Sequence, residues 1–211
     1  MELIKSLLDI LLHLDEHLGD WVVQYGTFIY IILFLIIFVE TGLVIMPLLP
    51  GDSLLFAVGA LAAQSSELNI WFVMPLLFCA ALLGDNVNYF VGKFFGDTIK
   101  SRERILFFKR EYITKTEEFY AKNGGKTVIM ARFVPIVRTF APFVAGAGSM
   151  DYRTYIVNCV IGALLWVFGI TLLGYFFGNI PIIKNNFEIV VLGIIGLSIL
   201  PILIGLFKKE K

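Results

Sequence analysis

Residues 29–60 read IYIILFLIIFVETGLVIMPLLPGDSLLFAVGA, and this stretch decides how the rest of the chain is interpreted. Its first part is an unbroken apolar run, whereas its second part is interrupted by Pro47, Pro50, Gly51 and Asp52. Proline removes a helical hydrogen-bond donor and clashes with the preceding turn, so a straight helix is not expected there. We therefore predict a membrane span followed by a re-entrant hairpin over 41–63, which enters the membrane and returns to the same side.

The composition of the whole chain agrees with a membrane protein. The 211 residues are 58% hydrophobic and 16% charged, against about 45 to 50% apolar and about 25% charged in soluble proteins. A spanning helix needs about 20 mostly apolar residues. Four windows satisfy this requirement: 21–39, 68–91, 154–183 and 189–207. The predicted fold is all-α, with about four transmembrane helices.

The first twenty residues have a different pattern. Leucines and isoleucines recur there at helical spacing, with mostly acidic or polar residues between them. This pattern predicts an amphipathic helix over 1–20 that lies in the membrane interface. His13 and His17 are four residues apart, but nothing supplies further ligands, so no metal site is predicted. The segment lacks the basic start and cleavage site of a signal peptide, and we expect it to be retained.

A second apolar stretch, 133–150, is interrupted by Pro135, Arg138 and Pro142. Here too a straight helix is not expected, and a second re-entrant hairpin is predicted. Broken backbone is tolerated at membrane depth only where it is buried in protein or lines a water-filled cavity. The two hairpins should therefore face each other.

The basic residues predict the orientation. Residues 97–126 contain eight lysines and arginines, and the C-terminal tail contains three lysines. Cytoplasmic segments are enriched in these residues, so both are expected in the cytoplasm. With four spans the N-terminus is then cytoplasmic as well. The first hairpin opens outward and the second inward.

A short internal repeat supports this arrangement. Residues 56–60 (FAVGA) resemble residues 143–147 (FVAGA), and residues 92–96 (GKFFG) resemble residues 174–178 (GYFFG). Each half of a single membrane domain, 21–211, is thus a hairpin followed by a span. Because the two following spans run in opposite directions, the pattern predicts an inverted repeat, as in many secondary transporters.

Five ionisable residues lie within or beside the apolar stretches: Glu40, Asp52, Asp85, Arg132 and Arg138. Such residues usually face a cavity or pair with one another, and they are candidates for function. Two guanidinium groups can bind phosphate, which makes Arg132 and Arg138 the predicted substrate-binding residues. Low dielectric favours a protonated carboxyl group, which makes Glu40 and Asp52 candidates for proton coupling.

Weaker candidates and alternatives remain open. Asp85 and Asn86 lie toward a cytoplasmic helix end, where they could equally cap the helix or be wet. Pro50, Gly51 and Pro135 are expected to support the hairpins. The charges could also form ion pairs that only pin the hairpins together. Both cysteines lie in apolar stretches, and no nucleophile with a base is evident, so we expect no enzyme, no cofactor and no nucleic-acid partner.

Four motifs in these segments resemble the DedA family, also called SNARE-associated or VTT-domain membrane proteins. They are Glu40-Thr-Gly-Leu43, Pro47-Leu-Leu-Pro-Gly-Asp-Ser53, Gly84-Asp-Asn-Val-Asn-Tyr89 and Ala131-Arg-Phe-Val-Pro-Ile-Val-Arg138-Thr-Phe-Ala-Pro142. The resemblance covers nearly the whole chain. It implies a bacterial inner-membrane protein with two facing re-entrant hairpins. The family's acidic pair corresponds to Glu40 and Asp52, and its arginine pair to Arg132 and Arg138.

The resemblance also implies a class of function. Some bacterial members are implicated in returning undecaprenyl phosphate across the membrane, eukaryotic relatives behave as phospholipid scramblases, and others are tied to proton-dependent drug and alkaline tolerance. Our leading hypothesis is therefore a proton-coupled transporter or flippase of an anionic, phosphate-bearing lipid, with membrane lipids and protons as partners and a possible homo-oligomer. The alternatives are a proton-coupled antiporter of cationic drugs or ions, and a structural or division-associated protein.

Overall fold

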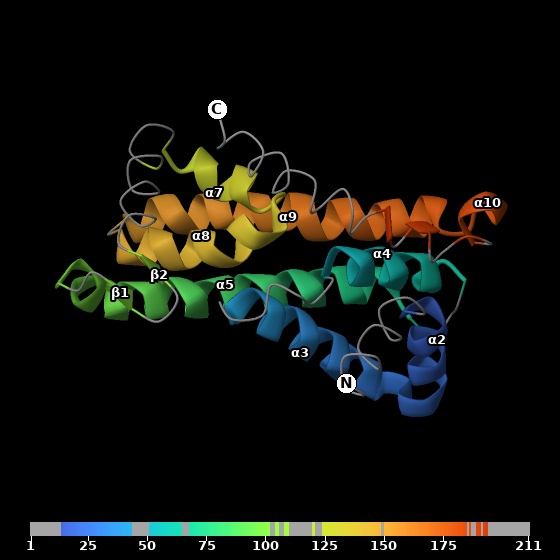
Figure 1. The fold of residues 1–211 in the computed structure, drawn as a ribbon. Helices are drawn as coiled ribbons and strands as arrows, with labels where there is room; N and C mark the ends of the chain where they lie inside the picture. Colours follow the sequence, from blue (N-terminus) through green and yellow to red (C-terminus); the bar gives the residue numbers. More distant parts are fainter. Residues whose placement is uncertain are drawn as a thin grey trace. The chain divides into compact units, whose positions relative to one another are not determined.

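The computed structural model describes residues 14–43, 51–64, 68–101, 104–105, 108–109, 120, 124–148, 150–184, 186, 189–190 and 192–193. Over these residues the fold is helical (Figure 1) apart from an antiparallel pair of two-residue strands, β1 (Arg104–Ile105) with β2 (Phe108–Lys109). The helices in chain order are α2 (Leu14–Tyr25), η1 (Gly26–Phe28), α3 (Ile29–Gly42), α4 (Gly51–Ala62), α5 (Ile70–Ser101), α7 (Lys126–Ala131), α8 (Pro135–Ala147), α9 (Tyr152–Phe177) and α10 (Pro181–Lys184).

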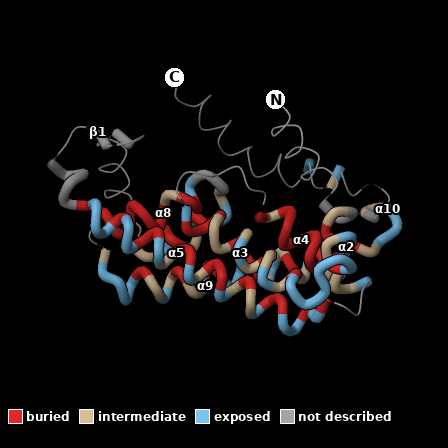
Figure 2. Tube along the Cα trace, turned by 90° about the horizontal axis from the view of Figure 1, so that it is seen from below, coloured by how far each residue is buried: buried red, intermediate tan, exposed pale blue. Residues whose placement is uncertain are grey.

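In the described part of the chain, three helical stretches are long and apolar enough to cross a membrane: His17–Gly42, Ile70–Gly96 and Tyr152–Phe177. They confirm three of the four predicted windows. The fourth, 189–207, lies almost entirely outside the described residues. Exposed positions run along α5 and α9 (Figure 2), and large apolar side chains such as Phe94 and Phe176 are among them. An apolar exposed surface is what contact with lipid requires.

The first span is bent, and its boundary differs from the prediction. The chain changes direction between α2 and α3 (Figure 1), at η1, where Gly26 adopts a φ of +51°. Glycine reaches this conformation readily because it lacks a Cβ. The predicted helix over 1–20 does not end at residue 20, because α2 continues to Tyr25. Residues 1–13 of that prediction, His13 included, lie outside the described residues.

The chain divides into two compact units. The first comprises Met1–Ile36, Leu48–Phe78 and Val167–Lys211, and the second comprises Ile37–Pro47 and Cys79–Trp166. In the first unit, α4 contacts the C-terminal part of α9 with no side chain between the backbones. A Cβ at Gly59 would collide with the backbone of Thr171, and a Cβ at Gly174 with the carbonyl of Phe56.

The second unit contains a contact of the same kind, in which α8 packs against the C-terminal part of α5. A Cβ at Gly146 would collide with the carbonyl of Tyr89, and a Cβ at Gly92 with the carbonyl of Phe143. These glycines occupy corresponding positions in the repeated segments noted above. In each unit, therefore, the short helix from one half of the sequence packs against the long helix from the other half.

The backbone over 126–147 corrects the prediction for the second hairpin. Helices α7 and α8 pack against each other and are joined by the turn at Arg132, Phe133 and Val134. Helix α8 is continuous, with Pro135 at its start and Pro142 inside it. Proline at the first helical position costs little, because its missing N–H would have no helical partner. Pro142 removes only one helical hydrogen bond. In the first predicted hairpin, the described residues are 41–43, at the end of α3, and 51–63, which contain α4; residues 44–50 lie outside the described residues.

Candidate functional site

The first element of the site is a buried ion pair between Arg132 and Asp85. Arg132 follows α7, and its side chain reaches α5, where Nη2 donates to Oδ2 of Asp85 over 2.5 Å. The two residues are 5% and 2% exposed. Nη1 of Arg132 donates to the carbonyl oxygen of Cys159 over 3.3 Å. The sequence suggested that Asp85 could be wet or a helix cap, and the structure shows that it is neither, because it lies well inside α5 and is buried.

One face of α9 holds this pair in place. Tyr155, Cys159, Gly162 and Trp166 share that face at helical spacing. The Tyr155 hydroxyl donates to the carbonyl oxygen of Asp85 over 2.9 Å, and the Cys159 thiol donates to Oδ2 of Asp85 over 3.3 Å. Gly162 lies against the arginine, since a Cβ there would be in van der Waals contact with Cδ of Arg132, at 3.5 Å.

A second buried ion pair lies in the same unit. Nη2 of Arg138, on α8, donates to Oε1 of Glu40, on α3, over 2.5 Å, and the two side chains are 6% and 1% exposed. The residues next to this pair are tied together by Asn88, which is fully buried. Its Nδ2 atom donates to the carbonyl oxygens of Thr41 and Thr139, over 3.3 and 2.7 Å. Asn88 thus fixes the backbone beside both charges.

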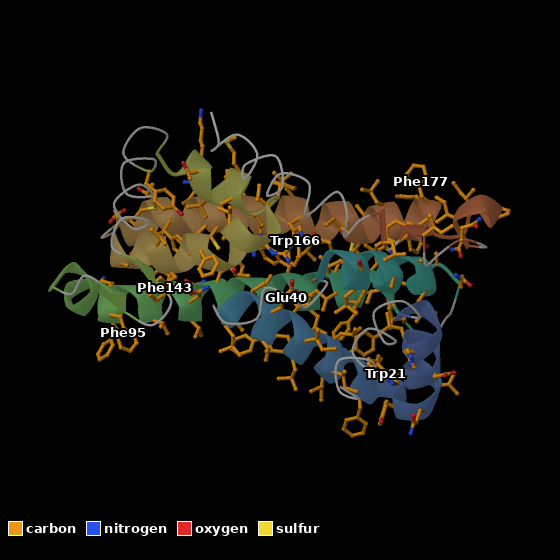
Figure 3. The ribbon with its side chains drawn as sticks, in the orientation of Figure 1. Trp21, Glu40, Phe95, Phe143, Trp166 and Phe177 are labelled. Carbon is orange, nitrogen blue, oxygen red and sulfur yellow. The ribbon has the colours of Figure 1, made fainter. Side chains whose placement is uncertain are left out.

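The two arginines share one aromatic ring. The Cζ atom of Arg138 lies 4.4 Å from the ring centroid of Trp166, and the Cζ atom of Arg132 lies 5.4 Å from it. Trp166 is buried on α9 and lies near Glu40 in the centre of Figure 3. A guanidinium over an indole face gains cation–π stabilisation. The ring therefore keeps two like charges close to each other while their carboxylates neutralise them.

A small pocket opens beside both guanidinium groups. It is lined by Asp85, Val128, Arg132, Arg138, Ala141 and Pro142. Its volume is about 10 Å³, on the order of the space needed by one water molecule. All of these residues belong to the second unit. The arrangement offers guanidinium donors and a carboxylate to a single small space.

Comparison with known proteins places this constellation in a family. The VTT domain profile matches residues 49–176. Protein DedA of Escherichia coli K12 is 52% identical over 212 residues, which cover 100% of this chain and 97% of that protein. The chain belongs to the DedA family. An uncharacterized membrane protein of Mycobacterium leprae is 44% identical over 81% of this chain and 76% of its own, and inner membrane protein YqjA of Escherichia coli K12 is 33% identical over 73% and 70%. No solved structure matches the chain.

The described ones among the remaining predicted residues of this DedA-family protein belong to α4, α5 and α8. Asp52 is half-buried in the first turn of α4, which begins at the buried Gly51, and both belong to the first unit. Asn86 accepts a hydrogen bond from the Tyr152 hydroxyl over 2.9 Å. Pro135 is the first residue of α8, and Pro50 lies outside the described residues. Within the described part of the chain, no group of three or more His, Cys, Asp or Glu residues could hold a metal.

Sequence reasoning gave no role to the residues that hold the charges in place, Asn88, Trp166 and Cys159 among them. Asn88 was visible as a polar residue inside an apolar window, in the motif Gly84-Asp-Asn-Val-Asn-Tyr89, and that signal could have identified it. Trp166 and Cys159 had no such signal, because both are ordinary members of an apolar span. The structure therefore brings Glu40, Asp85, Arg132 and Arg138 together in one unit and adds the residues that hold them.

Proposed function

We propose that this protein moves an anionic, phosphate-bearing lipid across the membrane, a polyprenyl phosphate or a phospholipid, in a proton-coupled process. Arg132 and Arg138 bind the phosphate, and Glu40 and Asp52 exchange protons. The observation that carries the proposal is the pair of buried guanidinium groups beside one tryptophan ring, each neutralised by a carboxylate.

The chemistry of the arginines supports this substrate class. A guanidinium presents parallel N–H donors that match two oxygens of a phosphate, and such charge-assisted pairs are the strongest hydrogen bonds in proteins. An unpaired buried arginine would be costly, so the carboxylates neutralise the site when no ligand is bound. Protonation of a carboxylate would release an arginine for the ligand and couple transport to protons.

The membrane arrangement is part of the proposal. It has four spans, two facing re-entrant hairpins in an inverted repeat, one membrane domain over 21–211, and both termini in the cytoplasm of a bacterium whose inner membrane holds the protein. The corresponding glycine contacts of α4 with α9 and of α8 with α5 support the repeat. The name of the YqjA relative, an inner membrane protein, supports the location.

Reconstitution tests the proposal. Purified protein in vesicles is assayed for translocation of labelled polyprenyl phosphate and of labelled phospholipid. Arg132→Lys and Arg138→Lys keep the charge but lose the planar fork, so we expect each lost charged hydrogen bond to cost about 1.5 to 3 kcal/mol, or roughly tenfold or more in affinity. Arg153→Lys, at an exposed position of α9, is the matched control. Transport at the wild-type rate by both variants would exclude phosphate binding through the guanidinium forks of Arg132 and Arg138.

A proton-coupled antiporter of cationic drugs or ions is the second candidate. It is favoured by the Oδ1 atom of Asn88, a buried acceptor that accepts no hydrogen bond and would suit a cation. In an antiporter, charge-neutral changes at Glu40 or Asp52 should abolish transport, whereas changes at Arg132 or Arg138 should only tune it. A lipid carrier should show the reverse order of sensitivity.

A further inference from the structure

The hydrogen bonds of Arg132 leave one of its donors unused. Nη2 is bonded to Asp85 and Nη1 to the carbonyl oxygen of Cys159. Nε is buried and donates no hydrogen bond. A guanidinium that binds an oxyanion through a fork uses two parallel N–H groups, but Asp85 engages only one of them. The bond to Asp85 therefore does not satisfy this arginine.

The pocket beside Arg132 has no room for a phosphate group next to the carboxylate. Its volume of about 10 Å³ is on the order of one water molecule, whereas a phosphate group carries four oxygens around phosphorus. Asp85 and both arginines line this pocket, and Glu40 is not among the lining residues. A phosphate that reaches Arg132 must consequently displace a lining group, and Asp85 is the lining residue that is bonded to this arginine and carries the same sign of charge as phosphate.

Charge leads to the same conclusion. Arg132 and Asp85 carry opposite charges and form a neutral buried pair. Adding a phosphate while Asp85 stays charged would leave excess negative charge in a buried place, which is costly, so Asp85 takes up a proton as it leaves Arg132. The Cys159 thiol donates to the same Oδ2 atom that Arg132 contacts. Asp85 therefore keeps one hydrogen bond when the arginine leaves it.

We propose that Asp85 is an internal competitor for phosphate, whose carboxylate occupies on Arg132 the place that a phosphate group takes, so that the ligand binds by exchange. In the exchange the hydrogen bond from Nη2 to Asp85 breaks, the Asp85 carboxylate takes up a proton, and Nη2 and Nε of Arg132 both donate to phosphate oxygens. Arg138 keeps its bond to Glu40, because the Glu40 carboxylate does not line the pocket. This inference rests on the proposed function and assigns to Asp85 a role in gating the phosphate site.

The test compares Asp85→Asn with wild type. Purified protein in phosphatidylcholine nanodiscs is titrated with labelled polyprenyl phosphate and, separately, with inorganic phosphate. Asparagine is nearly isosteric but cannot compete as an anion, so Asp85→Asn should bind phosphate about tenfold more tightly, the effect of one charged hydrogen bond no longer broken. Asp151→Asn is the charge-matched control, because Asp151 is exposed and caps α9 through Thr154, which asparagine also does.

Each outcome decides a question. Tighter binding of both ligands by Asp85→Asn supports exchange with the phosphate group itself, and tighter binding of the lipid alone supports exchange with a lipid headgroup. If wild type binds a ligand and Asp85→Asn binds it equally or more weakly, the exchange is overturned while the proposed function stands. If wild type binds neither ligand, and Arg132→Lys changes nothing, the proposed function fails instead.

A second variant covers the case in which Asp85→Asn does not fold. Cys159→Ala removes the thiol hydrogen bond to Oδ2 and leaves every charge in place. With that bond lost, Asp85 can no longer keep a hydrogen bond when Arg132 leaves it, so exchange becomes harder and phosphate binding should weaken by about threefold. Cys159→Ser keeps a donor and should bind like wild type. Unchanged or tighter binding by Cys159→Ala would contradict the exchange.

Discussion

Removing either partner of the Glu40–Arg138 pair should destabilise the protein strongly, and removing both should cost much less than the sum. The two side chains are 1% and 6% exposed and form a charged hydrogen bond of 2.5 Å. Glu40→Gln or Arg138→Gln alone leaves an uncompensated buried charge, which costs about 3 to 5 kcal/mol. The double variant has no buried charge at this position, so we expect a coupling energy of about 2 to 3 kcal/mol.

These stabilities are measured by the loss of helical circular dichroism during unfolding, with wild type, the two single variants and the double variant in the same detergent. Arg153→Gln removes an exposed arginine from α9 and should change stability by no more than about 0.5 kcal/mol. Strictly additive costs of Glu40→Gln and Arg138→Gln would refute direct coupling of the buried charges. The same variants distinguish a functional ion pair from a purely structural one, because full transport by the double variant would mean that the pair only holds the helices together.

Three further predictions concern packing, anchoring and topology. Gly92→Ala places a Cβ against the carbonyl of Phe143 and should destabilise the protein by about 1 to 3 kcal/mol, whereas Gly169→Ala, where a Cβ meets nothing, should be neutral or stabilising in the same unfolding assay. Tyr120→Phe removes a buried hydrogen bond to the Ala141 carbonyl and should lower the free energy of unfolding by about 1 kcal/mol. Burial raises the pKa of Tyr120 above 10.0, so the stability that the neutral phenol contributes declines as pH rises above that value. The phenylalanine variant should lose less stability than wild type over this alkaline range. In a background with Cys79→Ala and Cys159→Ser, an impermeant thiol reagent added outside should label Ser66→Cys but neither Ser101→Cys nor Lys209→Cys, and external labelling of Ser101→Cys would contradict the predicted orientation.

The spans could be predicted from the sequence because membrane crossing depends on local composition. A window of about 20 apolar residues is sufficient, and three predicted windows coincide with helices. Arg132, Arg138 and Glu40 could be selected as candidate site residues for the same reason, since a charged residue inside an apolar stretch can be recognised from the sequence alone.

The ion-pair partners could not be predicted, because they join distant parts of the chain. Arg132 and Asp85 are 47 positions apart, and Arg138 and Glu40 are 98 apart. Asp85 looked like a residue near a helix end because its apolar window stops soon after it, yet α5 continues to Ser101. Within that extension, Gly92 and Gly96 lie against the backbone of α8, a contact with a distant part of the chain.

The position at which the chain turns in the second hairpin could not be predicted from the local sequence either. Proline was expected to interrupt the helix, but Pro142 lies inside α8 and the chain turns at Arg132–Val134 instead. A proline inside a helix costs about 3 kcal/mol, and the packing of one face of α8 in a close contact offsets this cost. Here that face includes Gly146, which contacts the backbone of α5 directly.

The ring that both arginines share makes the protein a potential optical sensor of its own site. The chain has three tryptophans, and Trp21→Phe with Trp71→Phe would leave Trp166 as the sole indole emitter. Its fluorescence depends on the cations at its face, so a ligand that draws either guanidinium away should shift the intensity or wavelength of emission. Occupancy could then be followed in unlabelled lipid, without a dye or a radioactive headgroup.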